Sequence, residues 1–429
     1  MFQTFEQHAS PSQGPARLAA LRAALAADGL AGFVVPRADA HQGEYVAARD
    51  ERLQWLTGFT GSAGFCIILP EVAGVFIDGR YRTQVKGQID LTHFTPVPWP
   101  DVKPGDWIKS HLAAGVIGFD PWLHTADEID KLKILLEETS VTLLSTSNII
   151  DSIWQDQPAA PLGLAFPHPD TLAGETSTDK RKRLADGLSG AGQRAAVITL
   201  PDSLCWLLNI RGADVPRNPV LHGFAILHDD ARVTLFADSA KFDAATRAHL
   251  GPDVTLKPVD AFVAALRSLQ GPVRVDNMTA PLAVSQELKA AGIDVVWGDD
   301  PCRLPKARKN AAEIQGTRDA HLRDGAAMVE FLAIGAHAVR RFLNSFWSHE
   351  VNLISTSNSP LQWVAGAYYF KQHKPKSKVI VLDANAEIVS KKGLFTKVFN
   401  ETYAGIVDYR PNNIITAVDV ATKSVTTEF

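Results

Sequence analysis

Alternating helical and strand-like patterns of apolar residues cover the first 300 residues of the chain. An Ala- and Leu-rich amphipathic segment at 15–32 is followed by short apolar runs at 32–35, 65–69 and 74–78, which Gly and Pro punctuate. Runs of this length predict strands, and strands that alternate with amphipathic helices predict a sheet with helices on its faces. The pattern therefore predicts an α/β fold.

The same order of elements occurs twice, about 160 residues apart. A basic helical segment that runs to Gly187 precedes apolar runs at 196–200, 224–227 and 233–238. The alternation then continues, with helices expected near 241–250 and 281–290 and strands at 273–276 and 293–297. We therefore predict two homologous α/β domains, at 1–160 and 170–300, joined by a linker rich in Pro and Gly.

The chain changes in character beyond residue 300. A basic stretch and a helical pattern occupy 301–333. Residues 1–333 contain 12 Lys and 20 Arg, whereas residues 334–429 contain 8 Lys and 3 Arg. The segment 334–364 has no pattern that predicts an element. Residues 365–429 are expected to form a partial α/β, Rossmann-like fragment, with strands at 379–383, 405–409, 414–420 and 424–429 and a helix at 392–403. The last two strands are predicted to pair as a hairpin.

Composition and charge narrow the class of protein. The 429 residues are 46% hydrophobic and 21% charged, close to the ~45–50% and ~25% of soluble globular chains. A net charge of −4 gives no electrostatic reason to expect nucleic acid or an anionic membrane as partner. No apolar run approaches the ~20 residues that span a bilayer, and the first residues lack a signal-peptide pattern. We expect a cytoplasmic protein whose three cysteines, Cys66, Cys205 and Cys302, are buried and reduced.

The residues alone reveal no self-contained active site. The glycine-rich stretch 58–64 precedes a strand, which predicts a tight turn and not a phosphate cradle. Ser62 within it lacks the strand–turn–helix setting of a hydrolase nucleophile. The 13 His are scattered, and there is no HExxH motif and no close cluster of His with carboxylates. The sequence therefore predicts no catalytic, metal-binding or cofactor-binding residues.

Several polar residues allow two interpretations. Arg80 follows a strand, where it either forms a turn-locking ion pair with Asp78 or faces a substrate. Glu44 is either solvated or faces the same site. His41, His124 and His222 lie in loops or at strand ends, where a solvated or a hydrogen-bonded role is expected. The basic run 180–183 is predicted to be a solvated helix face, and the polar turn 211–214 is predicted to be structural.

Several stretches of this sequence resemble a known family. PRADAHQGEY (36–45), GFTGSAG (58–64), DGRY (78–81) and NIIDSIW (148–154) are similar to the first domain of the three-domain Xaa-Pro aminopeptidases, the aminopeptidase P type. LNIRGADVPRNPV (208–220) is similar to their second domain. KARKNAAEI (306–314) is similar to the first helix of their third, catalytic domain, which assigns 301–333 to that helix.

This resemblance implies two creatinase-type N-terminal domains and a pita-bread catalytic domain. In the family, the catalytic domain holds two Mn²⁺ or similar ions through two Asp, a His and two Glu, and releases the N-terminal residue from X-Pro peptides. None of those ligand motifs occurs in this chain. We therefore expect the pita-bread domain to be absent, with no catalytic or metal residue carried over and no cofactor in this chain. The resemblance implies that the first domain reaches over the peptidase cleft, with Glu44 and Arg80 as candidates for meeting the termini of the substrate.

The tail resembles a different family. AYYFKQHKPKSKVIVLDAN (367–385), continuing to YRPNN (409–413), is similar to an internal piece of the flavoprotein subunit of flavocytochrome c sulfide dehydrogenase. The FAD-binding glycine motif and the redox cysteines of that family are missing, since no Cys lies beyond Cys302. We expect no flavin to bind to the tail alone.

Three functional hypotheses follow. In the first, the chain is a truncated, chimeric composite. It would carry the non-catalytic part of an Xaa-Pro aminopeptidase joined near 334–364 to a flavoprotein fragment, and it would be inactive alone. In the second, it is a binding or scaffold module that pairs with a full-length aminopeptidase, with a homo-oligomer as a further arrangement. In the third, it is a fragment of a flavin-linked oxidoreductase.

Overall fold

The computed structural model describes residues 11–338, 346–354, 364–372, 417–419 and 424–426. The described residues up to Gly316 form one compact unit, and the described residues from Thr317 onward belong to a second. Within the described part of the chain, no helix is both long and apolar enough to cross a lipid bilayer.

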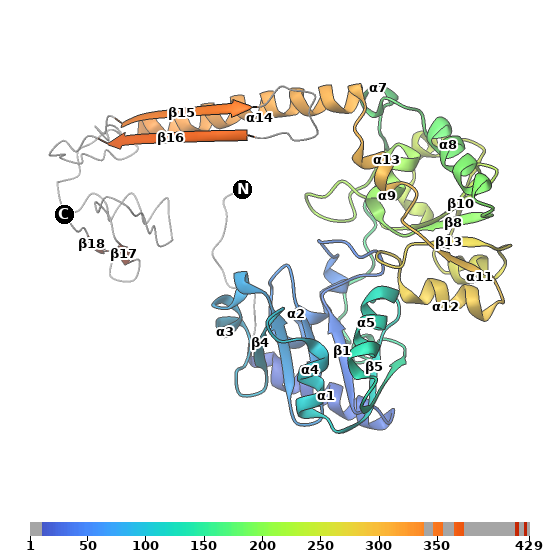
Figure 1. Cartoon of the computed structure of the whole chain (residues 1–429), viewed down its shortest axis with the longest axis vertical. Coiled ribbons are helices and arrows are strands. Elements are labelled where there is room, and N and C mark those ends of the chain that lie inside the picture. The colour runs from blue at the N-terminus through green and yellow to red at the C-terminus, as the bar shows by residue number, and fades with distance from the viewer. Residues whose placement is uncertain (1–10, 339–345, 355–363, 373–416, 420–423, 427–429) are drawn as a thin grey trace. The chain divides into compact units, whose positions relative to one another are not determined.

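Two six-stranded sheets with the same topology build the first unit (Figure 1). The strands of the first sheet are β1 Gly32–Pro36, β2 Phe65–Ile68, β3 Ala73–Ile77, β4 Thr95–Pro98, β5 Ala114–Phe119 and β6 Ser140–Ser145. Those of the second are β8 Ala195–Ile198, β10 Phe224–His228, β11 Val233–Phe236, β12 Val254–Lys257, β13 Val273–Val275 and β14 Val295–Trp297. A separate short pair joins β7 Phe166–Pro167 to β9 Ile210–Arg211.

The strand orders confirm the predicted repeat. The first sheet runs β4-β3-β2-β1-β5-β6 and the second runs β12-β11-β10-β8-β13-β14. In the first sheet, β1 pairs antiparallel with β2 and parallel with β5. In the second sheet, the equivalent strand β8 pairs antiparallel with β10 and parallel with β13. We call the parts built on these sheets the first and the second domain.

Helices cover both faces of each sheet. They are α1 Gly14–Ala27, α2 Arg52–Thr57, α3 Gln84–Gln88, α4 Pro104–His111, α5 Ala126–Leu136, α6 Ile149–Ile153, α7 Asp170–Ala173, α8 Ser177–Gly190, α9 Pro201–Leu208, α10 Ala244–Leu250, α11 Ala261–Arg267, α12 Leu282–Ala290 and α13 Arg303–Ala307. In the first domain, α1, α2, α3 and α6 pack on one face of the sheet, and α4 and α5 pack on the other. In the second domain, α8, α9 and α10 take one face, and α11 and α12 take the other.

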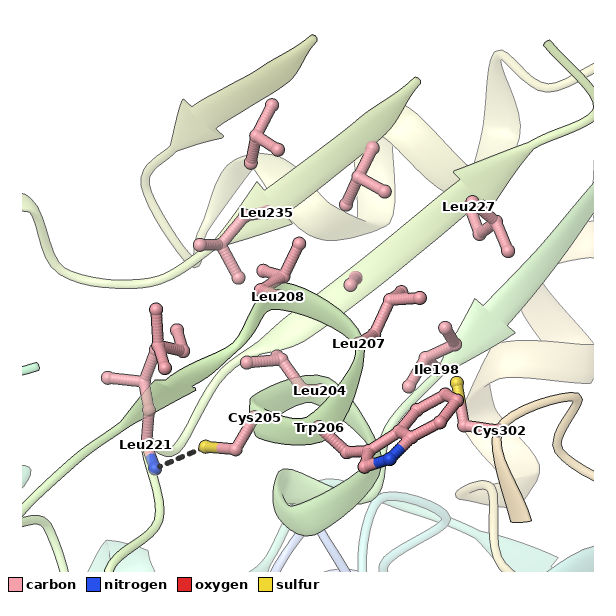
Figure 2. Close-up of a cluster of buried hydrophobic side chains, with 14 of the residues drawn as sticks. Ile198, Leu204, Cys205, Trp206, Leu207, Leu208, Leu221, Leu227, Leu235 and Cys302 are labelled. Carbon is pink, nitrogen blue, oxygen red and sulfur yellow. Dashed lines mark hydrogen bonds between the residues drawn. The ribbon is translucent and has the colours of Figure 1, made fainter. Parts of the chain in front are cut away.

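Alternation along the strands gives each domain two core layers. Phe33 and Val35 of β1 join the layer under α1, whereas Val34 between them joins the layer under α4. Successive side chains of a strand point to opposite faces of a sheet, so strands buried on both faces are continuously apolar. In the second domain, Cys205 lies within one such layer, where its Sγ accepts the N–H of Leu221 at 3.3 Å (Figure 2).

All three cysteines are free and buried, as the sequence predicted. Cys302 joins the same core layer as Cys205 (Figure 2). Burial raises the pKa of the Cys205 thiol to about 11 and that of the Cys66 thiol further still. These thiols are therefore protonated at neutral pH and have the character of small apolar core groups.

Beyond the two domains, the described elements are a helix and two hairpins. The helix α14, Ala311–Ala338, begins later and ends later than the 301–333 range expected for it, and the start of that range contains the separate helix α13. β15 Phe346–Ile354 pairs antiparallel with β16 Val364–Gln372, a hairpin that the sequence did not predict. β17 Ala417–Asp419 pairs antiparallel with β18 Ser424–Thr426, which agrees with the hairpin predicted there. The predicted strands at 379–383 and 405–409 and the helix at 392–403 lie outside the described residues.

The two domains meet through a reciprocal contact between equivalent helix starts. Thr125 stands before α5 and Pro281 stands before α12, and these two residues form an isolated antiparallel bridge. The N–H of Asp127, two residues after Thr125, donates to the carbonyl of Asn277, four residues before Pro281, at 3.1 Å. The N–H of Ala283, two residues after Pro281, donates to the carbonyl of Pro121, four residues before Thr125, at 3.0 Å. The contact is thus self-complementary, like the isologous interface of a twofold dimer.

Candidate functional site

Three loops of the first domain converge at one edge of its sheet. Residues 37–47 follow β1, residues 58–64 precede β2, and residues 78–83 follow β3. Because β1 and β3 both run antiparallel to β2, the ends of β1 and β3 lie beside the start of β2. We call these three segments the loop cluster.

Arg37 ties two segments of the loop cluster together. It follows directly after β1, and its side chain is only 10% exposed. Its Nη1 donates to the carbonyl of Glu44 at 2.6 Å and to that of Ser62 at 3.1 Å. Its Nη2 lies 3.5 Å from Oε1 of Glu51. Burial raises the pKa of the Glu51 carboxyl, and the charge of Arg37 opposes that shift.

Tyr81 ties the third segment to the glycine-rich stretch. Its hydroxyl lies 2.6 Å from Oγ of Ser62 and accepts the N–H of Ser62 at 3.0 Å. The backbone and the hydroxyl of Ser62 thus both contact the phenol of Tyr81. Gly58 ends α2 with a φ of +87°, a conformation that favours glycine. The stretch 58–64 is therefore the structural turn that the sequence predicted.

Arg80 adopts the local ion pair that was one of its two interpretations. Its Nη2 donates to Oδ2 of Asp78 at 2.7 Å, and its Nε lies within 3.2 Å of both carboxylate oxygens. The guanidinium carbon lies 5.1 Å from the centre of the Tyr81 ring. This hydrogen bonding lowers the pKa of the Asp78 carboxyl and raises the pKa of Arg80, to which the charge of Glu44 also contributes.

The structure brings the two sequence candidates into electrostatic range of each other. Glu44 is exposed, and the side chain of Arg80 is 62% exposed. The bonds from Arg80 to Asp78 use Nε and Nη2, so Nη1 is the nitrogen that an incoming carboxylate would approach. The arrangement can present one negative and one positive group to a small charged ligand. Arg37 and Tyr81, which hold the backbone of this site, were not among the sequence candidates.

The sequence interpretation of the basic run 180–183 as a solvated helix face is wrong for two of its four residues, whereas Lys182 and Arg183 are exposed. Lys180 and Arg181 are 1% and 3% exposed, so they do not belong to a solvated helix face. The ammonium of Lys180 donates to the carbonyl of Trp206 at 3.0 Å and to Oδ1 of Asn209 at 2.6 Å. Burial lowers the pKa of Lys180 to about 8. These hydrogen bonds, not solvent, satisfy the ammonium.

The three histidines for which a solvated or a hydrogen-bonded role was expected are all buried. His41 and His222 are each 8% exposed and His124 is 6% exposed, so the solvated alternative is wrong for all three. The hydrogen-bonded alternative holds for His41, whose Nδ1 lies 3.2 Å from the carbonyl oxygen of Thr199 in the second domain. The polar turn that contains Asp214 is structural, as predicted, because Asp214 forms a buried ion pair of 2.8 Å with Lys241.

The described residues do not fit a metal centre. Nowhere in the described ranges do three or more His, Cys, Asp or Glu side chains come together in a way that could hold an ion. The chemistry that a dinuclear centre needs from its donor set is therefore not met in this part of the chain.

Comparison with known proteins matches these domains to one family. Residues 17–153 and residues 156–313 each match the creatinase/prolidase N-terminal domain. Residues 363–429 match the central part of the sulfide dehydrogenase (flavocytochrome c) flavoprotein chain. The sequence resemblances to both families are therefore confirmed.

Individual relatives agree with this assignment. A probable Xaa-Pro aminopeptidase P of Talaromyces stipitatus is 33% identical over 337 residues, which cover 74% of this chain and 50% of the relative. One of Coccidioides posadasii is 34% identical over 338 residues, covering 74% and 54%. The X-prolyl aminopeptidase of Caenorhabditis elegans, described as a cytosolic enzyme with a di-nuclear active site, superposes with a TM-score of 0.71 at 29% identity. That superposition covers 76% of this chain and 57% of the nematode chain. This chain thus spans about half the length of the curated relatives it matches.

Replacing Arg37 tests whether its guanidinium holds the loop cluster. Arg37→Leu removes the donors to two loop carbonyls, and we expect a loss of about 1–3 kcal/mol in the free energy of unfolding. Amide hydrogen exchange in 42–46 and 60–64 should also accelerate. Urea denaturation and exchange mass spectrometry measure the two effects.

The matched control is Arg82→Leu, which removes an ion pair whose two side chains are 55% and 63% exposed. Such a pair contributes about 1 kcal/mol or less. Equal effects of the two substitutions would contradict the role assigned to Arg37.

Proposed function

We propose that this chain, whose residues 17–153 and 156–313 are two creatinase/prolidase N-terminal domains, supplies the non-catalytic N-terminal part of an Xaa-Pro aminopeptidase. The parent reaction would be the metal-dependent release of the N-terminal residue from X-Pro peptides. The observation that carries the proposal is the tandem of the two domains, shared with aminopeptidase P relatives at 33–34% identity. By analogy with the cytosolic nematode enzyme, we place the chain in the cytoplasm.

The metal chemistry of that reaction would belong to another part of the protein. A dinuclear centre activates water and polarises the scissile carbonyl, and the described residues do not fit such a centre. What the described residues supply is a charged loop surface that can bind and orient a peptide.

The loop cluster would be the part that meets the peptide. The Glu44 carboxylate is suited to the free amino terminus of a peptide, and the Arg80 guanidinium is suited to a carboxylate. Arg37 holds the backbone at Glu44, while Asp78 and the ring of Tyr81 contact the guanidinium of Arg80 and restrain its orientation. Fixed side chains lose less conformational entropy on binding than free ones, which supports the assignment of this surface to substrate contact.

An activity assay tests the proposed function. The purified chain is incubated with Mn²⁺ and an X-Pro tripeptide, and release of the first residue is measured by mass spectrometry. We expect no release above a blank, whereas a full-length Xaa-Pro aminopeptidase P assayed alongside should turn over the same peptide. Turnover by the chain that a chelator abolishes would overturn the proposal of a non-catalytic part.

Peptide binding tests the role of Arg80. We expect X-Pro peptides to perturb the amide NMR signals of residues 44 and 78–84 at millimolar concentration. Arg80→Met should weaken this binding several-fold, since one charge-assisted hydrogen bond contributes about 1.5–3 kcal/mol at most and the exposed site screens it. Arg82→Met, which removes an exposed arginine two positions away, is the control and should leave binding unchanged. Identical binding by both variants would remove Arg80 from the site.

A further inference from the structure

The edges of the two sheets that face each other carry a pair of histidines whose rings are in contact. His41 comes from the loop after β1, and His222 comes from the segment that precedes β10. Their ring centres lie 4.7 Å apart. The His41 ring also lies 4.6 Å from the ring of Phe224 at the start of β10. A side chain of the first domain is thus enclosed by groups of the second.

Two of the charges that face His41 are paired with each other. Asp214 and Lys241 of the second domain form an ion pair of 2.8 Å between side chains that are 0% and 6% exposed. Asp214 also accepts the backbone N–H of His222 at 2.7 Å, and Lys241 donates to the carbonyl of His222. Asp39, which belongs to the first domain as His41 does, also faces this pair, and its Oδ2 lies 3.7 Å from Nε2 of His222.

This histidine pair is continuous with the reciprocal contact between the domains. Phe224 contacts His41 and also lies 6.0 Å, centre to centre, from the ring of Trp122. Trp122 follows Pro121, whose carbonyl accepts the N–H of Ala283 from the second domain. His41 is thus linked through the rings of Phe224 and Trp122 to a segment that hydrogen-bonds across the two domains.

We propose that His41 and His222 form an acid-sensitive latch between the two domains, in which proton uptake by His41 separates the paired sheet edges. A charge on the His41 ring would lie against His222 and Lys241. Asp214 is paired with Lys241, and the unpartnered Oδ2 of Asp39 lies against the His222 ring. In the separated state, water solvates the same charge. The latch is therefore closed near neutral pH and opens as the pH falls.

The sign of the pH dependence follows from the protonation of His41. Burial, followed by the neighbouring His222, lowers the pKa of His41 from its usual value to about 3 in the closed state. In the separated state, the pKa returns to about 6.5. Above that value, His41 is neutral in both states and the latch is unaffected. Between the two values, the separated state binds the extra proton, so each unit of falling pH raises the opening constant up to about tenfold.

Amide hydrogen exchange on the full chain measures this opening. The reporters are the N–H groups of Asp127, Leu282 and Ala283, which donate to carbonyls of the other domain. Between pH 6 and pH 4, their protection, corrected for intrinsic exchange, should fall several-fold to about tenfold per pH unit. Amides within the central strands β2 and β10 should keep their protection. Parallel loss of protection in these strands would indicate global acid unfolding and would overturn the latch.

Variants assign the effect to His41. In His41→Phe, which keeps a ring against Phe224 but cannot titrate, the pH slope at the three reporter amides should disappear. His41→Asn gives the same prediction and keeps a side-chain donor near the Thr199 carbonyl if the Phe variant folds poorly. His93→Phe replaces a half-exposed histidine of the first domain and should retain the slope. A wild-type slope in both His41 variants would contradict the proposal.

An NMR titration of the histidine ring carbons provides a readout independent of the variants. His41 should remain neutral well below pH 6 for as long as the reporter amides stay protected. Titration of His41 near its ordinary midpoint, with no loss of protection at those amides, would also overturn the latch.

Discussion

The structure of residues 11–316 depends on one reciprocal contact between equivalent helix starts. The N–H groups of Asp127 and Ala283 each donate to a carbonyl of the other domain, at the same offset from Thr125 and Pro281. Helix starts offer N–H groups that no intrahelical carbonyl satisfies, so two copies of one domain can satisfy each other there. In the first domain, the contact lies at the sheet edge where β1 and β5 end. In the second domain, it lies at the sheet edge where β8 and β13 end. The same edges hold the histidine pair, and the edge of the first sheet continues into the loop cluster.

The parts of the fold that the sequence predicted are those fixed by local chemistry. β1, β2, β3, β8, β10 and β11 are short apolar runs punctuated by Gly or Pro, and the repeat of their order was enough to predict two similar domains. β4 was not predicted, because Thr95–Pro98 contains two prolines. Proline within a strand is tolerated mainly in edge strands, and β4 is an edge strand. β6 is the opposite edge strand, with a polar Ser140–Ser145 pattern that does not indicate a core strand.

The residues of the candidate site also divide into those whose partners lie close by in the sequence and those whose partners lie far away. The pairing of Arg80 with Asp78 could be predicted because the two lie two positions apart after a strand. Arg37 holds carbonyls 7 and 25 residues away, and His41 meets a carbonyl 158 residues away, so only the folded chain reveals these partners. The burial of Lys180 was missed for a related reason. Its partners are the carbonyl of Trp206 and the amide of Asn209, and a backbone carbonyl has no sequence signature.

The two domains are expected to form one cooperative unit through the contact between their equivalent sheet edges. Urea unfolding at pH 7.5, followed by hydrogen exchange mass spectrometry, resolves peptides from β1 and β2 and peptides from β8 and β10 in the same sample. We predict that both sets lose protection in one coincident transition, because separating the edges exposes Phe224 and breaks the reciprocal hydrogen bonds. Two transitions at well-separated urea concentrations would show that the domains fold independently and would contradict the account.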